Sequence, residues 1–372
     1  MLATSRRPTS VAWCRMLGLA HCSAVAATAA TRPTLLVSFA TDKASVTMAR
    51  ALLSSAGSWA LADAHAEAGA ARAGSALWRA VRDHGPPVYL WQLDDSPVHA
   101  DHLDAEFAAL DGCELPAEVL FLSRHVSIAG TASLCVHPVG NPRAELPADF
   151  GGRAGVCVPP APRLAALYRL LCEEAKVEAL ARKASGSAEP FDFEPSFEAT
   201  HHGPLLEQSP CAFLEIGSDE SRWGRDDAGQ LWARVLSRAL GLGERAAEAP
   251  SWSELSDEQR AAATVVLVLG GGHYMSAAGD LARGSRSVYI GHMLASYSFD
   301  FRGDTDGPSW RSALDSAVAG TCAAYPGAGR IRALTAKKAF GAEKTSLLAS
   351  HLELQHGIQL AASKAEMLKL LQ

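Results

Sequence analysis

Short hydrophobic runs alternate along the chain with longer stretches that favour helix. The hydrophobic runs have the length and the β-branched or aromatic content of buried strands, and they lie at residues 35–39, 88–91, 212–217, 265–269 and 288–292. The helix-favouring stretches lie between them, at residues 46–53, 101–110, 162–182 and 230–240. Alternation of this kind is typical of an α/β protein in which helices cover a sheet. The pattern therefore predicts a three-layer α/β fold with a largely parallel or mixed sheet.

A polar stretch at residues 184–190 follows the long predicted helix and is the best internal boundary. It divides the domain at residues 34–372 into possible lobes at 34–184 and 191–372. Directly after it, hydrophobic and polar side chains alternate up to residue 200, which predicts a strand with one apolar and one acidic face. This strand presents Glu198 immediately before His201 and His202.

Five strand-like stretches run into turns that carry histidine. They lie at residues 119–125, 134–141, 197–204, 265–274 and 288–292, and they bring His125, His137, His201, His202, His273 and His292. If these strands share one sheet, their histidines meet in the crevice beyond the carboxyl ends of the strands. Imidazole is the commonest transition-metal ligand and titrates near neutrality. With Glu198, Glu215 and Asn141 at strand ends, the pattern predicts metal-assisted or acid-base chemistry, while the long spacings leave the ligands open.

Other motifs do not indicate a site. The glycines at 270–272 lack the spacing of a dinucleotide loop, and Glu343 occupies a glycine position of a Walker loop. The chain has neither a Gly-x-Ser-x-Gly elbow nor a His-Glu-x-x-His helix. The residues from His99 to Asp104 are typical of an exposed helix start. His351 and His356 are expected to be solvated on an amphipathic helix.

Composition and charge narrow the class of protein. The 372 residues are 48% hydrophobic with a net charge of −6, which indicates a globular chain and argues against a general DNA binder. A local basic stretch at residues 329–344 is either a solvated helix face or a contact for a polyanion. The eight cysteines lack metal-site or disulfide spacing, so reduced thiols are expected. No hydrophobic run is long enough to cross a membrane.

The N-terminal residues differ in composition from the rest. The first acidic residue is Asp42, and the residues before it contain four arginines among many alanines, serines and threonines. This composition is typical of an organellar transit peptide, predicted at residues 1–33. A secretory signal is the alternative, but His21 and Cys22 interrupt its apolar region. We therefore expect the chloroplast or the mitochondrion, with the cytoplasm as a further possible location.

Several of these segments together resemble the archaeal and plant type of D-aminoacyl-tRNA deacylase. The matching segments lie at residues 123–127, 137–141, 198–204, 213–218, 270–274 and 291–297, and Glu-Ala-Thr-His-His-Gly-Pro at 198–204 is the most specific. The resemblance implies a core like those of peptidyl-tRNA hydrolase and phosphorylase, one or two zinc ions, and hydrolysis of the ester between a D-amino acid and tRNA. One departure is that Met275 and Ser276 replace the proline and basic residue that usually follow Gly-Gly-Gly-His-Tyr.

The residues and the resemblance together give a candidate site. Its catalytic residues are Glu198, His201 and His202. Its metal ligands are His125, His201, His202, Glu215, His273 and His292. Its substrate-binding residues are Ser123, Arg124, His137, Asn141, Tyr274, Lys337 and Lys338.

The role of each group stays open at this point. Glu198 either takes a proton from water or orients a ligating histidine. The histidines at 125, 273 and 292 either hold zinc or hydrogen-bond the terminal adenosine. Two rival functions remain, a metal-dependent amidase or peptidase for a small molecule and a non-catalytic module that binds tRNA or stores metal. The oligomeric state is not indicated.

Overall fold

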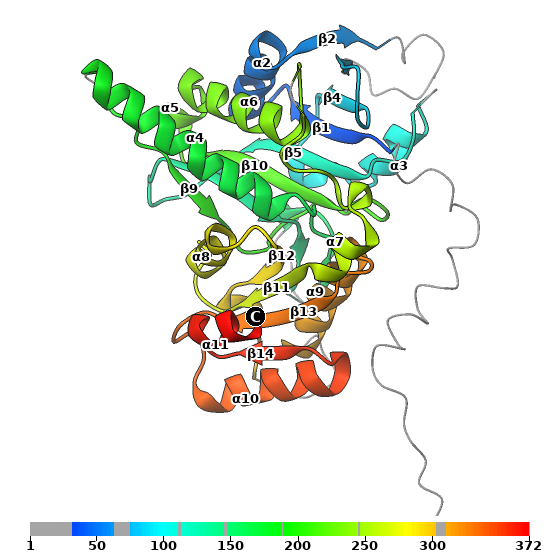
Figure 1. Cartoon of the computed structure of the whole chain (residues 1–372), viewed down its shortest axis with the longest axis vertical. Coiled ribbons are helices and arrows are strands. Elements are labelled where there is room, and N and C mark those ends of the chain that lie inside the picture. The colour runs from blue at the N-terminus through cyan, green and yellow to red at the C-terminus, as the bar shows by residue number, and fades with distance from the viewer. Residues whose placement is uncertain are drawn as a thin grey trace, which may run out of the picture.

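The fold is built from two sheets that lie one above the other in Figure 1. The computed structural model describes residues 32–62, 75–110, 113–143, 148–187, 189–244, 246–302 and 310–371. The predicted transit peptide at 1–33 therefore lies almost entirely outside the described residues. In the described part, the larger sheet has strand order β2-β3-β4-β1-β5-β10-β6-β9 and the smaller has order β12-β11-β13-β14.

The larger sheet is mixed. Its strands are β1 (Thr34–Phe39), β2 (Ser58–Leu61), β3 (Ala76–Val81), β4 (Val88–Leu93), β5 (Glu118–Arg124), β6 (Ser133–Pro138), β9 (Glu194–Phe197) and β10 (Cys211–Gly217). The central strands β4, β1, β5 and β10 are parallel, whereas β6 runs antiparallel to β10. The prediction of an α/β fold with a mixed sheet is confirmed.

Alternation along the central strands gives the larger sheet two different faces. On β10, Leu214 and Ile216 point to a core covered by α2 (Lys43–Ser55), α4 (Leu164–Ser185) and α6 (Asp226–Leu240). Phe213 points to the other face, where it packs in a smaller core with Phe121 and α3 (Leu103–Ala108). Glu215 shares this second face with Phe213 because side chains alternate along a strand. The second face is where the polar side chains of the site gather.

The smaller sheet is entirely parallel. Its strands are β11 (Thr264–Leu269), β12 (Val288–Leu294), β13 (Arg330–Thr335) and β14 (Gln359–Ala361). The helices α8 (Ser276–Gly284), α9 (Trp310–Ala324), α10 (Ala342–His351) and α11 (Lys364–Leu370) surround it, and a π-helical turn, Leu352–His356, continues α10. Short elements complete the chain: α5 (Glu220–Trp223), α7 (Asp257–Ala262), the β7 (Gly140–Asn141) and β8 (Val156–Cys157) ribbon, and 3-10 turns Pro97–His99, Ala148–Phe150, Trp252–Glu254 and Ser296–Ser298.

The histidine-bearing strands do not share one sheet, contrary to the expectation from sequence. β5, β6 and β9 belong to the larger sheet, whereas β11 and β12 belong to the smaller. Along the chain, the passage from the larger sheet to the smaller one comes between β10 and β11. The boundary between the two sheets is therefore not at residues 184–190. The segment after β9 joins the sheets, since the Ala199 amide donates to the His273 carbonyl at 2.8 Å and the Thr200 amide to the Met293 carbonyl at 2.6 Å. This join brings the histidines of both sheets together.

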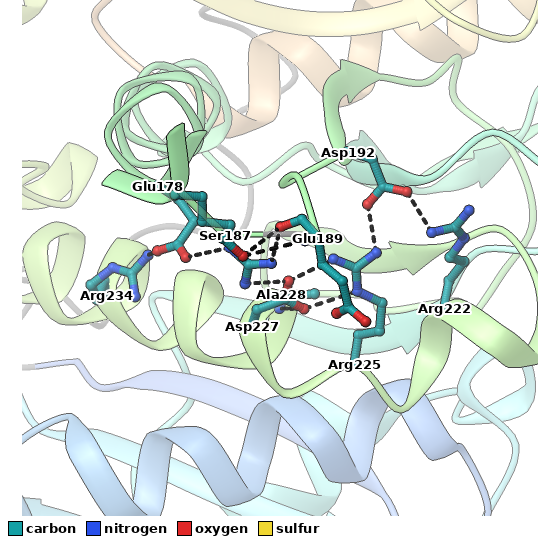
Figure 2. A network of polar contacts seen from close by, with 10 residues as sticks. Glu178, Ser187, Glu189, Asp192, Arg222, Arg225, Asp227, Ala228 and Arg234 are labelled. Atoms are coloured by element: carbon teal, nitrogen blue, oxygen red, sulfur yellow. Dashed lines mark hydrogen bonds and ion pairs between the residues drawn. The ribbon is translucent and has the colours of Figure 1, made fainter. Parts of the chain in front are cut away.

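A group of ion pairs, which we name the arginine network, fixes the approach to β9 (Figure 2). Asp192, two residues before β9, accepts from Arg222 at 2.6 Å and Arg225 at 2.5 Å. Arg225 also contacts Asp227 at 2.6 Å, and Arg182 near the end of α4 contacts the same carboxylate at 2.7 Å. The network therefore ties β9 to α4 and α6.

Among the described residues, no helix has the length and hydrophobicity to span a bilayer.

Candidate active site

Glu198 lies at the centre of a group of histidines. It follows β9, is fully buried, and pairs with Tyr274 in an isolated antiparallel bridge between the two sheets. Its Oε1 lies 3.0 Å from Nδ1 of His125, and its Oε2 lies 3.2 Å from Nε2 of His273 and 3.8 Å from Nε2 of His201. One carboxylate therefore contacts three imidazoles from three separate segments.

Three further contacts fix how His137, His201 and His202 are oriented. Nδ1 of each ring lies within hydrogen-bond distance of a backbone carbonyl: Pro138 at 3.1 Å, Ala199 at 2.7 Å and Gly203 at 2.6 Å, respectively. A carbonyl only accepts, so each Nδ1 carries a proton, and Nε2 is the atom that each ring can offer to a metal. The three rings lie together, with centroids 4.2 to 4.9 Å apart. This arrangement brings the three imidazoles together at one place.

The backbone around His202 is closely packed. His202 has φ of 44°, in the left-handed region that residues with a Cβ rarely adopt. At the next residue, Gly203, a Cβ would meet Gly152 N at 2.4 Å and Val98 O at 2.5 Å. Only glycine fits there, and the tight contact holds the turn that points His202 at its neighbours.

The charges in the site are divided between two kinds of histidine. Burial opposes protonation of His125, but contacts with Glu198 and Glu215 outweigh it and raise the pKa of His125 to about 11. Burial, reinforced by the neighbouring His137, lowers the pKa of His202 to about 4 and that of His201 well below its usual range. His125 is thus a cation held by two carboxylates, whereas His201 and His202 are neutral and available as ligands.

Several buried polar atoms of the site have no hydrogen-bond partner. They are both carboxylate oxygens of Glu198, Oε2 of Glu215, Nε2 of His137 and Nε2 of His292. The carboxylate contacts of Glu198 are short but lack hydrogen-bond geometry. A buried polar group without a partner costs about 1–3 kcal/mol, so a cluster of such groups is typical of a place that binds a metal or another ligand.

The donor atoms present fit a metal ion. Ligand atoms of His137, His201 and His202 lie within 4.8 Å of one another, as do those of Glu198, His201 and His273 and those of His137, Glu198 and Glu215. The first group is the best set, because carbonyl contacts at Nδ1 are the usual way in which a protein orients ligating imidazoles. Three histidine ligands with an open position are also a known catalytic zinc arrangement. We name the seven residues His125, His137, His201, His202, His273, Glu198 and Glu215 the histidine cluster.

A cavity of about 950 Å³ opens onto the histidine cluster. Its walls include His125, His201, His202, Glu215 and His273, whereas Glu198 and His137 lie behind them. Sites for small ligands commonly have volumes of about 300–1,000 Å³, so this cavity has room for a group larger than an amino acid.

Three of the predicted substrate residues line this cavity. Ser123, Arg124 and Asn141 are on its wall. Tyr274 is not part of the wall, but its hydroxyl is 3.1 Å from Nε2 of His125, which is. His137 belongs with the candidate ligands instead.

Other predicted site residues lie apart from the histidine cluster. His292 is fully buried on β12, its Nδ1 is 3.0 Å from Oγ1 of Thr200, and burial lowers its pKa to about 3. It offers no atom to the groups that could hold a metal in the described part of the chain. Lys337 and Lys338 are exposed in the turn after β13 and do not line the cavity.

Two expectations about polar residues outside the site are corrected in part, although His99 and His102 are exposed as predicted. Asp104 is completely buried, because its carboxylate accepts from the amides of Gln208 at 3.0 Å and Ser209 at 2.8 Å. His351 and His356 are largely buried rather than solvated, since both rings contact Asp315. In both cases, the sequence pattern is typical of a solvated helix face, and it does not reveal the hydrogen-bonding partner because that partner lies far away in the sequence.

Sequence reasoning missed two residues that shape the cavity. Asp42 caps α2 by accepting from the Ser45 amide at 3.0 Å, and its second oxygen accepts from the Arg124 amide at 3.0 Å. The helix cap was readable from sequence, but the contact with β5 was not. Tyr297 lines the cavity, and its hydroxyl lies 3.3 Å from Nδ1 of His273. The sequence feature that could have identified Tyr297 is its position at the end of residues 291–297, one of the segments that carry the family resemblance.

Comparison with known proteins gives one consistent family. Residues 114–355 match the family model described as D-aminoacyl-tRNA deacylase. The D-aminoacyl-tRNA deacylase of Arabidopsis thaliana is 34% identical over 262 residues, which cover 67% of this chain and 77% of that protein. The protein of the same description from Archaeoglobus fulgidus is 31% identical over 212 residues, covering 57% of this chain and 64% of that protein.

A solved structure shares the fold. A crystal structure of a conserved protein of unknown function superimposes with a TM-score of 0.62 at 24% identity, covering 88% of this chain and 94% of that one. At this identity, the likeness supports the arrangement of the sheets and helices and nothing about chemistry. The family match contains every member of the histidine cluster.

Proposed function

Because the chain belongs to the D-aminoacyl-tRNA deacylase family, we propose that it hydrolyses the ester bond of D-aminoacyl-tRNA and releases the free D-amino acid and tRNA. Its class is therefore that of a hydrolase acting on ester bonds. The observation that carries the proposal is that the family match includes the whole histidine cluster, where buried ligand atoms without partners face a cavity.

The cavity binds the aminoacyl end of the tRNA. Its volume of about 950 Å³ accommodates an amino acid together with part of the terminal nucleoside. Arg124 and Arg143 on its wall supply positive charge for the phosphate that follows. An aminoacyl ester is already activated, so holding it against a positioned water removes much of the remaining barrier.

The metal proposed for the site is zinc, held by His137, His201 and His202. A metal bound there supplies a Lewis acid beside the ester carbonyl. The support is the group of three imidazoles, each held by a carbonyl contact at Nδ1 that leaves Nε2 to face a metal. Glu215 lies beside this set, with its Oε1 3.5 Å from Nε2 of His137, and the fourth position would be left for water.

His273 is the best-placed proton acceptor. Its side chain is about one-third exposed on the cavity wall, and its Nε2 lies 3.2 Å from the buried Glu198. A carboxylate behind an imidazole fixes its tautomer and stabilises the imidazolium that forms when it takes a proton from water. Glu198 itself is fully buried, which favours an orienting role for it over direct contact with substrate.

A deacylation assay separates this function from its rivals. D-tyrosyl-tRNA and L-tyrosyl-tRNA are incubated with the protein before and after chelation, and metal content is measured by elemental analysis. We expect release of D-tyrosine in strong preference to L-tyrosine, loss of activity on chelation, and recovery with added zinc. Full activity in a metal-free sample contradicts the metal proposal, and no release of D-tyrosine with zinc present contradicts the function.

Two properties outside the site complete the proposal. Lys337 and Lys338 extend the tRNA contact beyond the cavity, supported by their exposure in the basic stretch at 329–344. Residues 1–33 direct the protein to a chloroplast or mitochondrion, supported by their arginines and lack of acidic residues. A fluorescent protein fused to residues 1–33 is expected in an organelle, and a wholly cytoplasmic signal contradicts this proposal.

A further inference from the structure

A second group of metal-binding side chains lies away from the histidine cluster, where α10 packs on α9. Asp315 comes from the middle of α9, and His351 and His356 come from the end of α10 and its π turn. Nε2 of His351 lies 2.6 Å from Oδ1 of Asp315, and Nε2 of His356 lies 2.7 Å from the same oxygen. None of the three residues lines the active-site cavity.

The π turn is what brings the two histidines together. Residues five apart on a regular α-helix are separated by about 140° around the axis, so His351 and His356 would point in different directions. A π turn closes with an i to i+5 hydrogen bond and places such a pair on one face, and turns of this kind are frequent at functional sites. The two ring centroids lie 5.8 Å apart as a result.

The surrounding core holds this turn in place. Leu352, the first residue of the turn, and Ile358, which follows the turn, are buried in the same hydrophobic core as Leu314 of α9. The ring of the buried Trp310 packs edge-to-face on His351, with centroids 5.3 Å apart. The three ligand atoms therefore do not need to be assembled from flexible side chains.

The chemistry of the three groups suits a transition-metal ion. We propose that Asp315, His351 and His356 form a second site for a divalent metal of the zinc class, which fastens the π turn to α9. Two imidazoles and one carboxylate are a common ligand set for such ions, with the remaining positions taken by water. The Asp315 side chain is 45% exposed, so solvent reaches those positions.

Only a small adjustment separates the hydrogen-bonded arrangement from a coordinated one. Bonds of about 2.0 Å at tetrahedral angles place ligand atoms about 3.3 Å apart, so the nitrogen-to-oxygen distances must widen by less than about 1 Å.

Metal stoichiometry tests the proposal without an activity assay. Wild-type protein, Asp315→Asn, the double variant His351→Gln with His356→Gln, and the control Glu353→Gln are dialysed against Zn²⁺ and analysed for zinc per chain. Glu353 is an exposed carboxylate on the same π turn. We expect the first two variants to hold one zinc fewer than the wild type and the control.

Two results would overturn the second site. The first is equal zinc content in all four well-folded proteins, judged by circular dichroism. The second, which does not depend on the folding of any variant, is crystallographic. Crystals of the wild type grown with Zn²⁺ and measured at the zinc absorption edge should show an anomalous peak between Asp315 and the two histidines, and its absence rejects the site. A His201→Ala variant should keep this peak, which separates the outcome from that of the proposed active site.

Discussion

The histidine cluster and the arginine network are two groups of charged side chains at opposite ends of the same strand, and they differ in what surrounds them. Asp192, before β9, has both carboxylate oxygens paired with arginines and remains partly exposed. Glu198, after β9, is fully buried and neither of its oxygens has a hydrogen-bond partner. Satisfied surface pairs fix position at little energetic cost, whereas unsatisfied buried groups are costly unless something binds them. The contrast indicates that the ion pairs before β9 stabilise the fold, whereas the buried polar groups after β9 are placed for binding and catalysis.

The largest expected effect comes from the proposed metal ligands. Alanine at His201 or His202 removes one of the three proposed imidazole ligands, so we expect the rate of D-tyrosyl-tRNA deacylation to fall by at least about 10²-fold. Single-turnover kinetics and zinc content are measured together, with His102→Ala as the control because His102 is exposed and outside the cavity. Near-normal turnover in both variants would remove the pair from the mechanism.

Glu198→Gln tests the buried carboxylate and should have a somewhat smaller effect. The amide removes the negative charge beside His125 and His273 and places a second donor against one of them. We expect activity or metal affinity to fall by about 10- to 100-fold, the usual loss when a group that orients a ligand is changed.

The matched control for that variant is Glu194→Gln, an exposed carboxylate on the same strand. It should leave activity and zinc content unchanged. If Glu198→Gln behaved in the same way, the unsatisfied burial of Glu198 would have no functional meaning, and the contrast between the two ends of β9 would fail.

The double variant Lys337→Gln with Lys338→Gln is expected to change the binding of tRNA and not the chemical step. If the two lysines contact tRNA phosphates, the double variant binds all charged tRNAs more weakly, and the slope of log affinity against log salt falls by about 2. Filter binding over a salt series measures it, with Lys369→Gln as the exposed control. An unchanged slope would show that these lysines are solvated surface residues that do not contact tRNA.

The strands and helices could be predicted from sequence because their signals are local. The runs at 35–39, 88–91 and 265–269 correspond to β1, β4 and β11, and the polar face of residues 191–200 led to Glu198. The division into two sheets could not be predicted, because it depends on which strand edges pair. Nothing in the sequence of β6 shows that it runs antiparallel to β10.

The metal ligands could not be assigned from sequence for a related reason. His137 and His292 look alike in sequence, since each ends a hydrophobic run. They differ in the partner at Nδ1, a backbone carbonyl for His137 and the Thr200 hydroxyl for His292, and in whether neighbouring ligand atoms lie within reach. The contact between His292 and Thr200 and the grouping of ligand atoms around His137 arise only when distant segments have packed together.

The smallest effect is expected in the arginine network, where Asp192→Asn should leave deacylation unchanged. Burial alone would raise the pKa of Asp192, but Arg225 and Arg222 outweigh it and lower the pKa. A lowered folded-state pKa contributes stability that is present above the unfolded pKa of about 4 and is lost as the pH falls through the folded value. At neutral pH, the variant should therefore be less stable by only about 0.2–1 kcal/mol, and the difference from wild type should vanish in acid. Urea unfolding at pH 7 and pH 3 measures both, with Asp257→Asn as a control for a single exposed pair. A large loss of activity in Asp192→Asn would show that the two ends of β9 are coupled and that the separation of structure from chemistry is wrong.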